Sequence, residues 1–373
     1  MKMRKSKLGF VLSGGGSRGA YQCGVWQAMT ELGIKPDIVC GVSVGAINGS
    51  MVMLEDVIKT ANLWRAMETN MIFDVSSDAQ VHDFAKEFVK RGGAGTSGLH
   101  SLLEEYIDEE FIRNSETDFG LLTVEFPSMK PYYLWLEDIP EGQLCDYIAA
   151  SSSAFPAVQT CKIGDKEFID GGYADNLPVS MARERGATHI IAVNLDAIGK
   201  IHPEDFVDAE DLTLIESAWD LGDFLVFEKE NAKRILRLGY LDAMKTFQIF
   251  EGHYFTFVKN ALPKRELMQA DAAAKIFGLD PLVLYRKEFF IENLGQAVSE
   301  AKAEAGESID SFENKNINLK DINKLVNRKT SVLVIAGNLK SKGGDSIFLS
   351  KYAVKLLHDE IAAANFLVKH QLV

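Results

Sequence analysis

The first 55 residues alternate between short apolar runs and stretches with apolar positions at helical spacing. Residues 7–13 (KLGFVLS) form an apolar run that favours a strand, and glycines follow it directly. Residues 19–32 (GAYQCGVWQAMTEL) predict a helix, and a second buried-strand pattern at 37–42 precedes helical character at 46–55. This βαβα order predicts a parallel sheet with helices packed against it.

The same alternation continues to about residue 200. Strand-like segments at 119–126 and 130–137 predict a strand pair, and 161–169 predicts a hairpin. Residues 187–195 (ATHIIAVNL) predict a further buried strand. We therefore expect an α/β fold class with a central, mainly parallel sheet flanked by helices.

Beyond residue 200 the composition becomes typical of helices. Segments 204–246 and 263–305 are rich in Leu, Ala, Glu and Lys and contain few helix breakers. A polar stretch then precedes a strand-like run at 331–336 (SVLVIA) and a helical pattern at 346–369. The pattern predicts a catalytic domain (1–200), a helical extension (201–305), a polar linker (306–330) and a C-terminal strand–helix unit (331–373).

The composition is that of a folded protein without a membrane span. Of the 373 residues 47% are hydrophobic and 25% are charged, and no apolar run approaches the roughly 20 residues that a membrane-spanning helix needs. The 53 acidic residues outnumber the 40 Lys and Arg residues, which gives a formal net charge of −13. Because such a charge repels polyanions, we expect an uncharged or zwitterionic substrate and no nucleic-acid partner.

The cysteines and the N-terminal segment indicate the cellular compartment in which we expect the protein. The four cysteines are scattered and form no Cys-x-x-Cys pair, so they do not indicate a disulfide framework. The apolar run Leu8–Leu12 is too short for the hydrophobic core of a signal peptide. We therefore expect a reducing, cytoplasmic location. The cysteines are Cys23, Cys40, Cys145 and Cys161.

Two pentapeptides fit the G-x-S-x-G pattern of a serine nucleophile. Gly41-Val42-Ser43-Val44-Gly45 lies between a predicted strand and a predicted helix, which is the context that a nucleophile elbow requires. Gly15-Gly16-Ser17-Arg18-Gly19 also fits, but a run of glycines suits the presentation of backbone N–H groups better than the holding of a nucleophile. We favour Ser43 over Ser17.

A serine hydrolase also needs an oxyanion hole of at least two N–H groups. Gly14, Gly15 and Gly16 are candidates to supply one or two of them. The N–H group of Val44, directly after the favoured serine, is a further candidate.

The glycine loop has an alternative interpretation. Gly14-x-Gly16-x-x-Gly19 fits the dinucleotide-binding pattern after a strand, so an oxidoreductase that uses the Gly14–Gly19 loop is a competing hypothesis. That fingerprint expects an acidic residue near the end of the second strand, where this chain has Val42-Ser43.

The serine needs a base, and the histidines do not indicate one. None of the seven histidines lies in a loop context that marks a triad member. Asp170-Gly171-Gly172 is the other candidate, because a carboxylate followed by two glycines can face a cleft from a tight turn. The same tripeptide also fits an ordinary β-turn.

Taken together, three motifs resemble the ordered motif set of patatin-like phospholipases. They are the Gly14–Gly19 loop, the Gly41–Gly45 pentapeptide and Asp170-Gly171-Gly172, with Asn176 and Pro178 downstream. The resemblance covers residues 8–180. It implies a Ser–Asp dyad with Ser43 as nucleophile and Asp170 as its activating group, an oxyanion hole in the glycine loop, and no metal or cofactor. The supporting motif residues are Arg18, Gly19, Gly41, Gly45, Gly171 and Gly172.

The resemblance also implies a function. It implies a lipid acyl hydrolase that cleaves carboxylic esters of phospholipids or related lipids through an acyl-enzyme on Ser43, with a transient membrane-surface contact. For Asp170 to act as a base, its pKa is expected to be modestly raised by partial dehydration. For Arg18 we favour bracing of the loop through carbonyl groups over phosphate binding. The competing hypothesis from another functional class is an interaction protein, such as a translocated effector, in which residues 200–373 bind a host partner.

Overall fold

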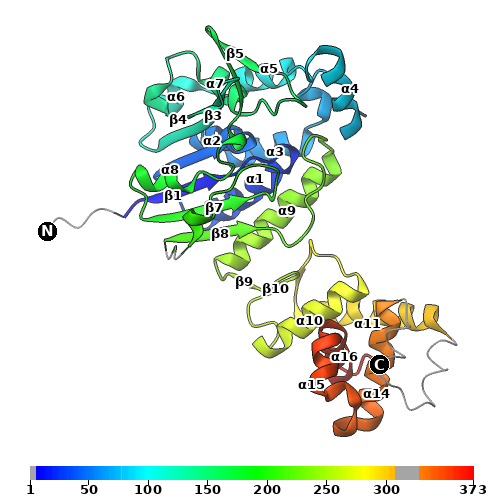
Figure 1. The fold of residues 1–373 in the computed structure, drawn as a ribbon. Coiled ribbons are helices and arrows are strands. Elements are labelled where there is room, and N and C mark those ends of the chain that lie inside the picture. Colours follow the sequence, from blue (N-terminus) through cyan, green and yellow to red (C-terminus); the bar gives the residue numbers. More distant parts are fainter. Residues whose placement is uncertain (1–5, 77, 208, 210, 307–326) are drawn as a thin grey trace. The chain divides into compact units, whose positions relative to one another are not determined.

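The computed structural model describes residues 6–76, 78–207, 209, 211–306 and 327–373 (Figure 1). Contacts divide the chain into two compact units, Met1–Ala243 and Met244–Val373.

Within its described residues, the first unit is built on an eight-stranded sheet of order β5-β6-β3-β2-β1-β7-β8, with β4 paired to β3. Strands β1, β2, β3, β7 and β8 run parallel, whereas β4, β5 and β6 add antiparallel pairs. This mainly parallel sheet confirms the expected fold class. The strands are β1 (Leu8–Leu12), β2 (Ile38–Val42), β3 (Asp118–Phe126), β4 (Lys130–Trp135), β5 (Cys161–Ile163), β6 (Lys166–Asp170), β7 (His189–Asn194) and β8 (Leu212–Glu216).

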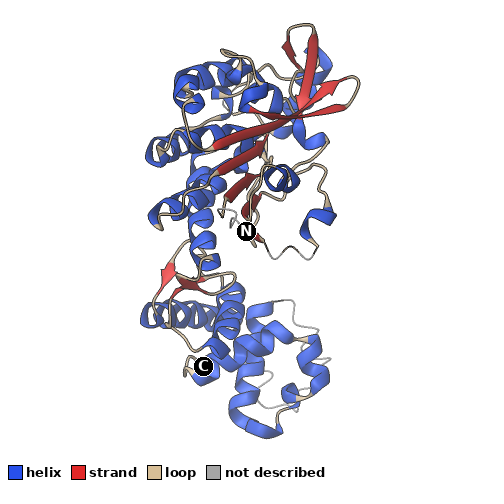
Figure 2. Cartoon of the chain, turned by 90° about the vertical axis from the view of Figure 1, so that its left-hand side faces the viewer, coloured by secondary structure: helices blue, strands red, loops and turns tan. Residues whose placement is uncertain are grey.

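Helices cover both faces of this sheet (Figure 2). Ile38 and Cys40 of β2 pack in a core with Met181 of α8. Val39 lies between them and faces the other side, where it approaches Gly49 of α2, because successive strand residues point to opposite faces. The helices are α1 (Gly19–Glu31), α2 (Val44–Met53), α3 (Val57–Ala66), α4 (Val81–Arg91), α5 (Ser97–Tyr106), α6 (Glu109–Arg113), α7 (Leu144–Ser151), α8 (Val179–Glu184) and α9 (Lys229–Thr246).

Helices α1 and α9 approach each other at two glycines. A Cβ atom on Gly24 would lie 1.9 Å from the carbonyl oxygen of Leu236, and one on Gly239 would lie 2.0 Å from the carbonyl oxygen of Tyr21. The Tyr21 hydroxyl also donates a 2.8 Å hydrogen bond to Asp242. The backbones of the two helices are therefore in direct contact, which only glycine permits at both positions.

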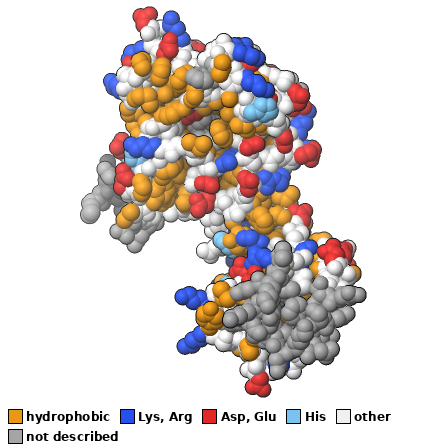
Figure 3. All heavy atoms as spheres, turned by 45° about the vertical axis from the view of Figure 1, so that its right-hand side comes forward, with side chains coloured by type: hydrophobic (Ala, Val, Ile, Leu, Met, Phe, Trp, Pro, Cys, Tyr) orange, Lys and Arg blue, Asp and Glu red, His pale blue; other side chains and the backbone are white. Residues whose placement is uncertain are grey.

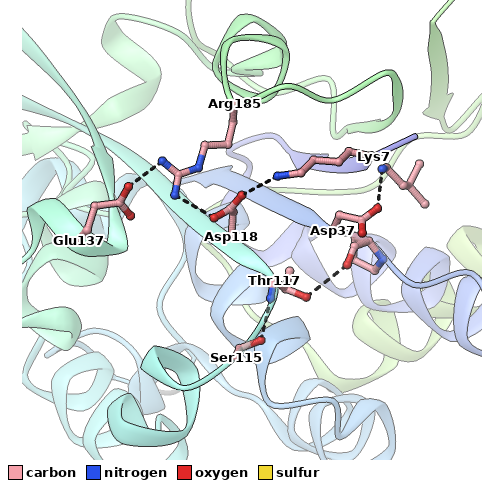
Figure 4. Close-up of polar contacts among 9 residues, drawn as sticks. Lys7, Asp37, Ser115, Thr117, Asp118, Glu137 and Arg185 are labelled. Carbon is pink, nitrogen blue, oxygen red and sulfur yellow. Dashed lines mark hydrogen bonds and ion pairs between the residues drawn. The ribbon is translucent and has the colours of Figure 1, made fainter. Parts of the chain in front are cut away.

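An ion-pair network lies at the amino ends of the parallel strands (Figure 4). Asp118, the first residue of β3, lies 2.8 Å from the Arg185 guanidinium and 3.3 Å from the Lys7 ammonium. Arg185 also pairs with Glu137 at 2.6 Å. Burial acts to raise the pKa of Asp118, but the hydrogen bonds and charges of Arg185 and Lys7 outweigh it and hold this pKa below its usual value.

The sheet continues past residue 200, where the sequence predicts the end of the catalytic domain. Strand β8 pairs in parallel with β7, and α9 packs on α1. The helical prediction for 204–246 is therefore wrong over Leu212–Glu216. Only Ile215 of this edge strand is buried, so the strand leaves a weak hydrophobic pattern in the sequence.

The described part of the second unit is mostly helical, with a small sheet of order β11-β10-β9. Phe290 packs edge-on against Phe257 and Phe366 in its core, at ring-centroid distances of 4.9 Å and 5.7 Å. The elements are β9 (Phe250–Glu251), β10 (Thr256–Val258), α10 (Lys264–Phe277), β11 (Leu284–Tyr285), α11 (Lys287–Ala305), α14 (Arg328–Lys342), α15 (Lys351–Leu356) and α16 (His358–Lys369).

Two predictions for the C-terminal region need correction. The strand predicted at 331–336 is wrong, because these residues lie within α14 and are all buried. A continuous apolar run has the same appearance in a buried strand and in a helix covered on all sides. The helix predicted at 346–369 is interrupted at Leu357, between α15 and α16.

The predicted polar linker, 306–330, falls largely on residues 307–326, which lie outside the described residues. Among the helices that are described, none combines the length and the apolar character needed to span a membrane.

Candidate active site

Strand register brings the end of β6 beside the residue that follows β2. Val42 of β2 pairs with Leu122 of β3, and the next residue of β3, Thr123, pairs with Asp170. Ser43 follows Val42 directly, so β3 holds Ser43 and Asp170 on its two flanks. The Ser43 hydroxyl donates a hydrogen bond to the Asp170 carboxyl group.

Ser43 lies on a sharp turn between β2 and α2. Its backbone angles are φ 56° and ψ −129°, a combination that side-chain-bearing residues rarely adopt and that costs on the order of 1–3 kcal/mol. A Cβ atom on Gly41 would lie 2.1 Å from the carbonyl oxygen of Gly45, and one on Gly45 would lie 2.2 Å from that of Leu12. The two glycines of the pentapeptide therefore permit the strained turn, which is the geometry of a nucleophile elbow.

A serine run at the end of α7 supports both members of the pair. The buried Ser151 hydroxyl accepts a hydrogen bond from the Ser43 backbone N–H at 2.9 Å and donates one to Leu122 at 2.7 Å. The Ser153 carbonyl oxygen accepts the backbone N–H of Asp170 at 2.8 Å. Ser151 lies outside the motifs that predict the site. The feature of the sequence that could have pointed to Ser151 is a run of three consecutive serines after a helix of small residues.

The environment of Asp170 favours a base that works near neutral pH. The side chain is buried, with 7% of its surface exposed, and this burial is the main reason why its pKa is raised from 3.8 to a net value of about 6. Hydrogen bonds from the Ser43 hydroxyl and from the Gly172 N–H, the latter at 2.8 Å, partly offset the rise. The modest increase expected for Asp170 is therefore confirmed. Gly171 and Gly172 form the short 3-10 turn that follows.

The predicted oxyanion loop lies beside Ser43, and Gly14, Gly15, Gly16 and Val44 all line the same cavity. The N–H group of Gly14 donates a 3.2 Å hydrogen bond to the Asn176 carbonyl oxygen, so it already has an acceptor. Val44 is the first residue of α2, where N–H groups have no acceptor within the helix.

Ser17 and Arg18 have structural contacts at the end of the glycine loop. The Ser17 hydroxyl donates to the carbonyl oxygen of Asp223. The Arg18 guanidinium donates to the carbonyl oxygens of Gly222 at 2.7 Å and Asp196 at 2.6 Å. Arg18 therefore braces the loop, as expected. Gly19, which follows, begins α1.

A cavity of about 490 Å³ opens beside Ser43 and Asp170. Trp64 stacks on Phe227 in its wall, with ring centroids 6.2 Å apart. Hydrophobic side chains also gather on the face of the first unit that Figure 3 presents. No histidine occurs among the described residues that line the cavity. Buried apolar lining residues include Leu63, Trp64, Met67, Ile72, Phe73 and Leu103.

Comparison with known proteins supports the interpretation of the motifs. Residues 10–183 match the family model described as patatin-like phospholipase, which confirms the resemblance. The lysophospholipase NTE1 of Candida albicans is 30% identical over 212 residues, which cover 54% of this chain and 14% of that protein. The neuropathy target esterase sws of Drosophila melanogaster is 28% identical over 201 residues, covering 51% and 13%. The chain thus spans only 13–14% of the length of these relatives.

Two solved structures are similar over most of the chain. VipD from Legionella pneumophila is 13% identical, with a TM-score of 0.43, and the match covers 99% of this chain and 92% of VipD. The type III effector ExoU is also 13% identical, with a TM-score of 0.36 and coverage of 97% and 77%. At these TM-scores neither structure adds to the description of the fold.

Proposed function

From the premise that residues 10–183 form a patatin-like phospholipase domain, we propose that the protein is a serine hydrolase that cleaves carboxylic ester bonds of phospholipids or related lipids. The observation that carries this proposal is the hydrogen bond from the Ser43 hydroxyl to the buried Asp170 carboxyl group beside an apolar cavity. The names of the relatives, lysophospholipase and esterase, agree with it.

The first half of the reaction forms an acyl-enzyme. Asp170 accepts the hydroxyl proton while the Ser43 oxygen attacks the ester carbonyl carbon. The negative charge that develops on the carbonyl oxygen accepts hydrogen bonds from the N–H groups of Gly15, Gly16 and Val44. Loss of one such donor typically slows a reaction of this type by about 10²–10³-fold.

Completion of the acyl-enzyme and its hydrolysis each release one product. The tetrahedral intermediate collapses, the alcohol leaves with the proton returned by Asp170, and the acyl group remains on Ser43. Water then attacks the acyl-enzyme with Asp170 again as base, so a carboxylic acid leaves and the Ser43 hydroxyl is restored. Every proton in this cycle moves between Ser43, Asp170, the alcohol and water, so the scheme uses no metal or cofactor.

The cavity supports a lipid ester as the substrate. Its buried walls are apolar side chains from α3, α5 and the segment between them, and an acyl chain gains free energy when it leaves water for such walls. The apolar lining of the cavity also distinguishes this site from a dinucleotide-binding crevice, which needs polar partners for ribose and phosphate groups.

A transient contact with a lipid surface is part of the proposal. Ile198 and Tyr173 both line the cavity and expose 88% and 47% of their surface, and exposed apolar groups at a site mouth suit such a contact. In a Ser43→Ala background, Ile198→Asp is expected to weaken binding to phosphatidylcholine vesicles about tenfold in a sedimentation assay. Ile58→Asp is the matched control, because Ile58 is 68% exposed on α3 and does not line the cavity. Equal losses in both variants would contradict the contact.

The four free cysteines agree with a reducing, cytoplasmic compartment. Measurement of free thiols in protein purified without reductant tests this part of the proposal, because a stable disulfide would contradict it.

Labelling with a fluorophosphonate probe tests the function and the nucleophile together. Mass spectrometry is expected to find one adduct, on Ser43, in the wild-type chain and none in Ser43→Ala. Ser17→Ala is the control and should label like wild type. An adduct on Ser17 would show that Ser17, and not Ser43, is the nucleophile. Absence of any adduct in the wild-type chain would favour an interaction protein, and bound nicotinamide or flavin absorbance would favour the oxidoreductase.

A further inference from the structure

The cavity beside Ser43 contains little charge. Among the described residues that line it, the charged ones are Asp170 and Lys200. Asp170 is assigned to proton transfer, which leaves the Lys200 ammonium as a cation without a role in the reaction. Lys200 is exposed to solvent, so it belongs to the open part of the cavity rather than to the buried apolar walls.

Backbone hydrogen bonds fix Lys200 next to the reacting groups. Its N–H donates to the carbonyl oxygen of Gly172 at 2.9 Å, and its own carbonyl oxygen accepts the N–H of Asn176 at 2.6 Å. Gly172 in turn donates its N–H to Asp170 at 2.8 Å. The Lys200 backbone is thus joined to the catalytic carboxyl group through a single intervening residue.

The ammonium group is available for a ligand. No ion pair of Lys200 occurs among the residues that the structure describes. Two acidic residues are within reach of its electrostatic influence, Asp175 and Glu204. Asp175 accepts the N–H of Leu177 at 3.1 Å, and Glu204 pairs with His202 at 3.0 Å. Glu204 therefore has another partner, whereas Asp175 has one at Oδ1 alone, because its Oδ2 is buried without a hydrogen-bond partner among the described residues.

The orientation of a bound ester follows from the two ends of the cavity. With the ester carbon at Ser43 and the acyl chain among the apolar walls, the alcohol half of the substrate extends toward the open end, where Lys200 lies. In a phospholipid this half carries a phosphate, and an anionic oxygen is a strong acceptor for an ammonium N–H. In a neutral acylglycerol the same position carries only hydroxyl or ester groups.

We propose that Lys200 binds the phosphate of the substrate and makes the site selective for phosphate-bearing lipids over neutral acylglycerols. The inference rests on the proposed lipid hydrolase function and identifies its substrate class. In a chain whose formal net charge is −13, a local cation at the site counteracts the repulsion that an anionic group would otherwise meet.

A selectivity assay tests this role. Palmitoyl lysophosphatidylcholine and monopalmitoylglycerol are compared in the same detergent micelles. The ratio of their kcat/KM values is expected to fall about tenfold in Lys200→Met, mainly through a higher KM for the phospholipid, since a charge-assisted contact is lost. Lys200→Arg should retain most of the ratio. Lys162→Met, an exposed lysine of β5 outside the cavity, is the matched control and should leave it unchanged. A ratio within twofold of wild type in Lys200→Met would overturn the proposal.

A binding measurement separates this proposal from the hydrolase function. In Ser43→Ala protein, calorimetry compares monomeric dodecylphosphocholine with monomeric dodecyl maltoside, and Lys200→Met is expected to reduce the preference for the former about tenfold. Glycerophosphocholine, which has no alkyl chain, is expected to bind far more weakly, and equal binding would point to a free phosphate compound instead of a lipid. If the wild-type protein hydrolyses neither substrate, the hydrolase function fails. If it hydrolyses both but the binding preference does not depend on Lys200, only the selectivity proposal fails.

Discussion

Two aspartates of the same sheet have contrasting surroundings. One lies at the amino ends of the parallel strands and the other at their carboxyl ends. Asp118 begins β3 and lies between the cations Arg185 and Lys7, which hold its pKa below the usual value. Asp170 ends β6, where burial raises its pKa to about 6 and no cation lies within ion-pair distance among the described residues. At the amino ends of the parallel strands, cations stabilise the ionised carboxylate of Asp118. At the carboxyl ends of these strands, burial disfavours the ionised carboxylate of Asp170.

The contrast predicts opposite contributions to stability. A lowered pKa means that ionised Asp118 stabilises the fold above its unfolded-state pKa, and this stabilisation is lost as the pH falls through its folded-state pKa. The raised pKa of Asp170 means that its ionisation is more costly in the folded state, so it destabilises the fold increasingly between pH 3.8 and about 6 and fully above that range. The carboxyl ends of the parallel strands therefore hold the proposed base, Asp170, in an environment that lowers the stability of the fold.

Asp170→Asn should produce the largest change. We expect turnover to fall by about 10³-fold because the amide does not accept the Ser43 proton. At pH 8 the free energy of unfolding should rise by up to about 3 kcal/mol, because a buried charge is removed, and the gain should shrink toward pH 4. Turnover of a chromogenic ester and urea unfolding measure the two effects. Retained turnover would remove Asp170 from the mechanism, and a loss of stability at pH 8 would contradict the assigned pKa.

The pH profile should give the next largest change. Because Asp170 must be deprotonated to act as a base, kcat/KM for a monomeric ester should fall about tenfold per pH unit below an inflection near pH 6. Asp118→Asn is the control, and it should leave this inflection in place. An inflection near pH 4 would show that the base is not dehydrated.

Asp118→Asn should produce the smallest change. Its ion pairs are partly exposed to solvent, with 26% of the Asp118 side-chain surface accessible, so the variant should lose only about 1 kcal/mol of unfolding free energy. Turnover should stay within about twofold of wild type, because the residue lies at the far edge of the sheet. Asp165→Asn, at the exposed β5–β6 turn, should lose less. A loss that persists below the folded-state pKa of Asp118 would show that packing, not charge, is responsible.

Part of the fold and of the candidate site could be predicted from the sequence. Buried strands such as β1 and β2 leave continuous apolar runs, and the turns at Gly14–Gly19 and Gly41–Gly45 need glycines, so these elements and the α/β class were accessible. The dyad assignment came from the order of motifs and stays a prediction until the nucleophile is labelled. The structure does bring its members into hydrogen-bond contact.

The residues that were missed act through partners far away in the chain. Ser151 meets Ser43 across 108 positions, and Lys200 reaches the site through Gly172. Neither the run of serines at 151–153 nor the single lysine at 200 indicates which distant residues it will contact. Strand β8 and helix α14 were misassigned for another reason, because burial is decided by neighbouring elements and not by the periodicity of the segment itself.

The paired glycines of α1 and α9 impose a constraint on how this protein changes over evolutionary time. Since a methyl group at Gly24 or at Gly239 would meet the backbone of the other helix, a substitution at either one is tolerable only if the helices separate. Positions 24 and 239 should therefore vary in concert among relatives, and a chain that has lost one glycine should show a compensating change where that glycine meets the other helix, near Leu236 for Gly24 or near Tyr21 for Gly239.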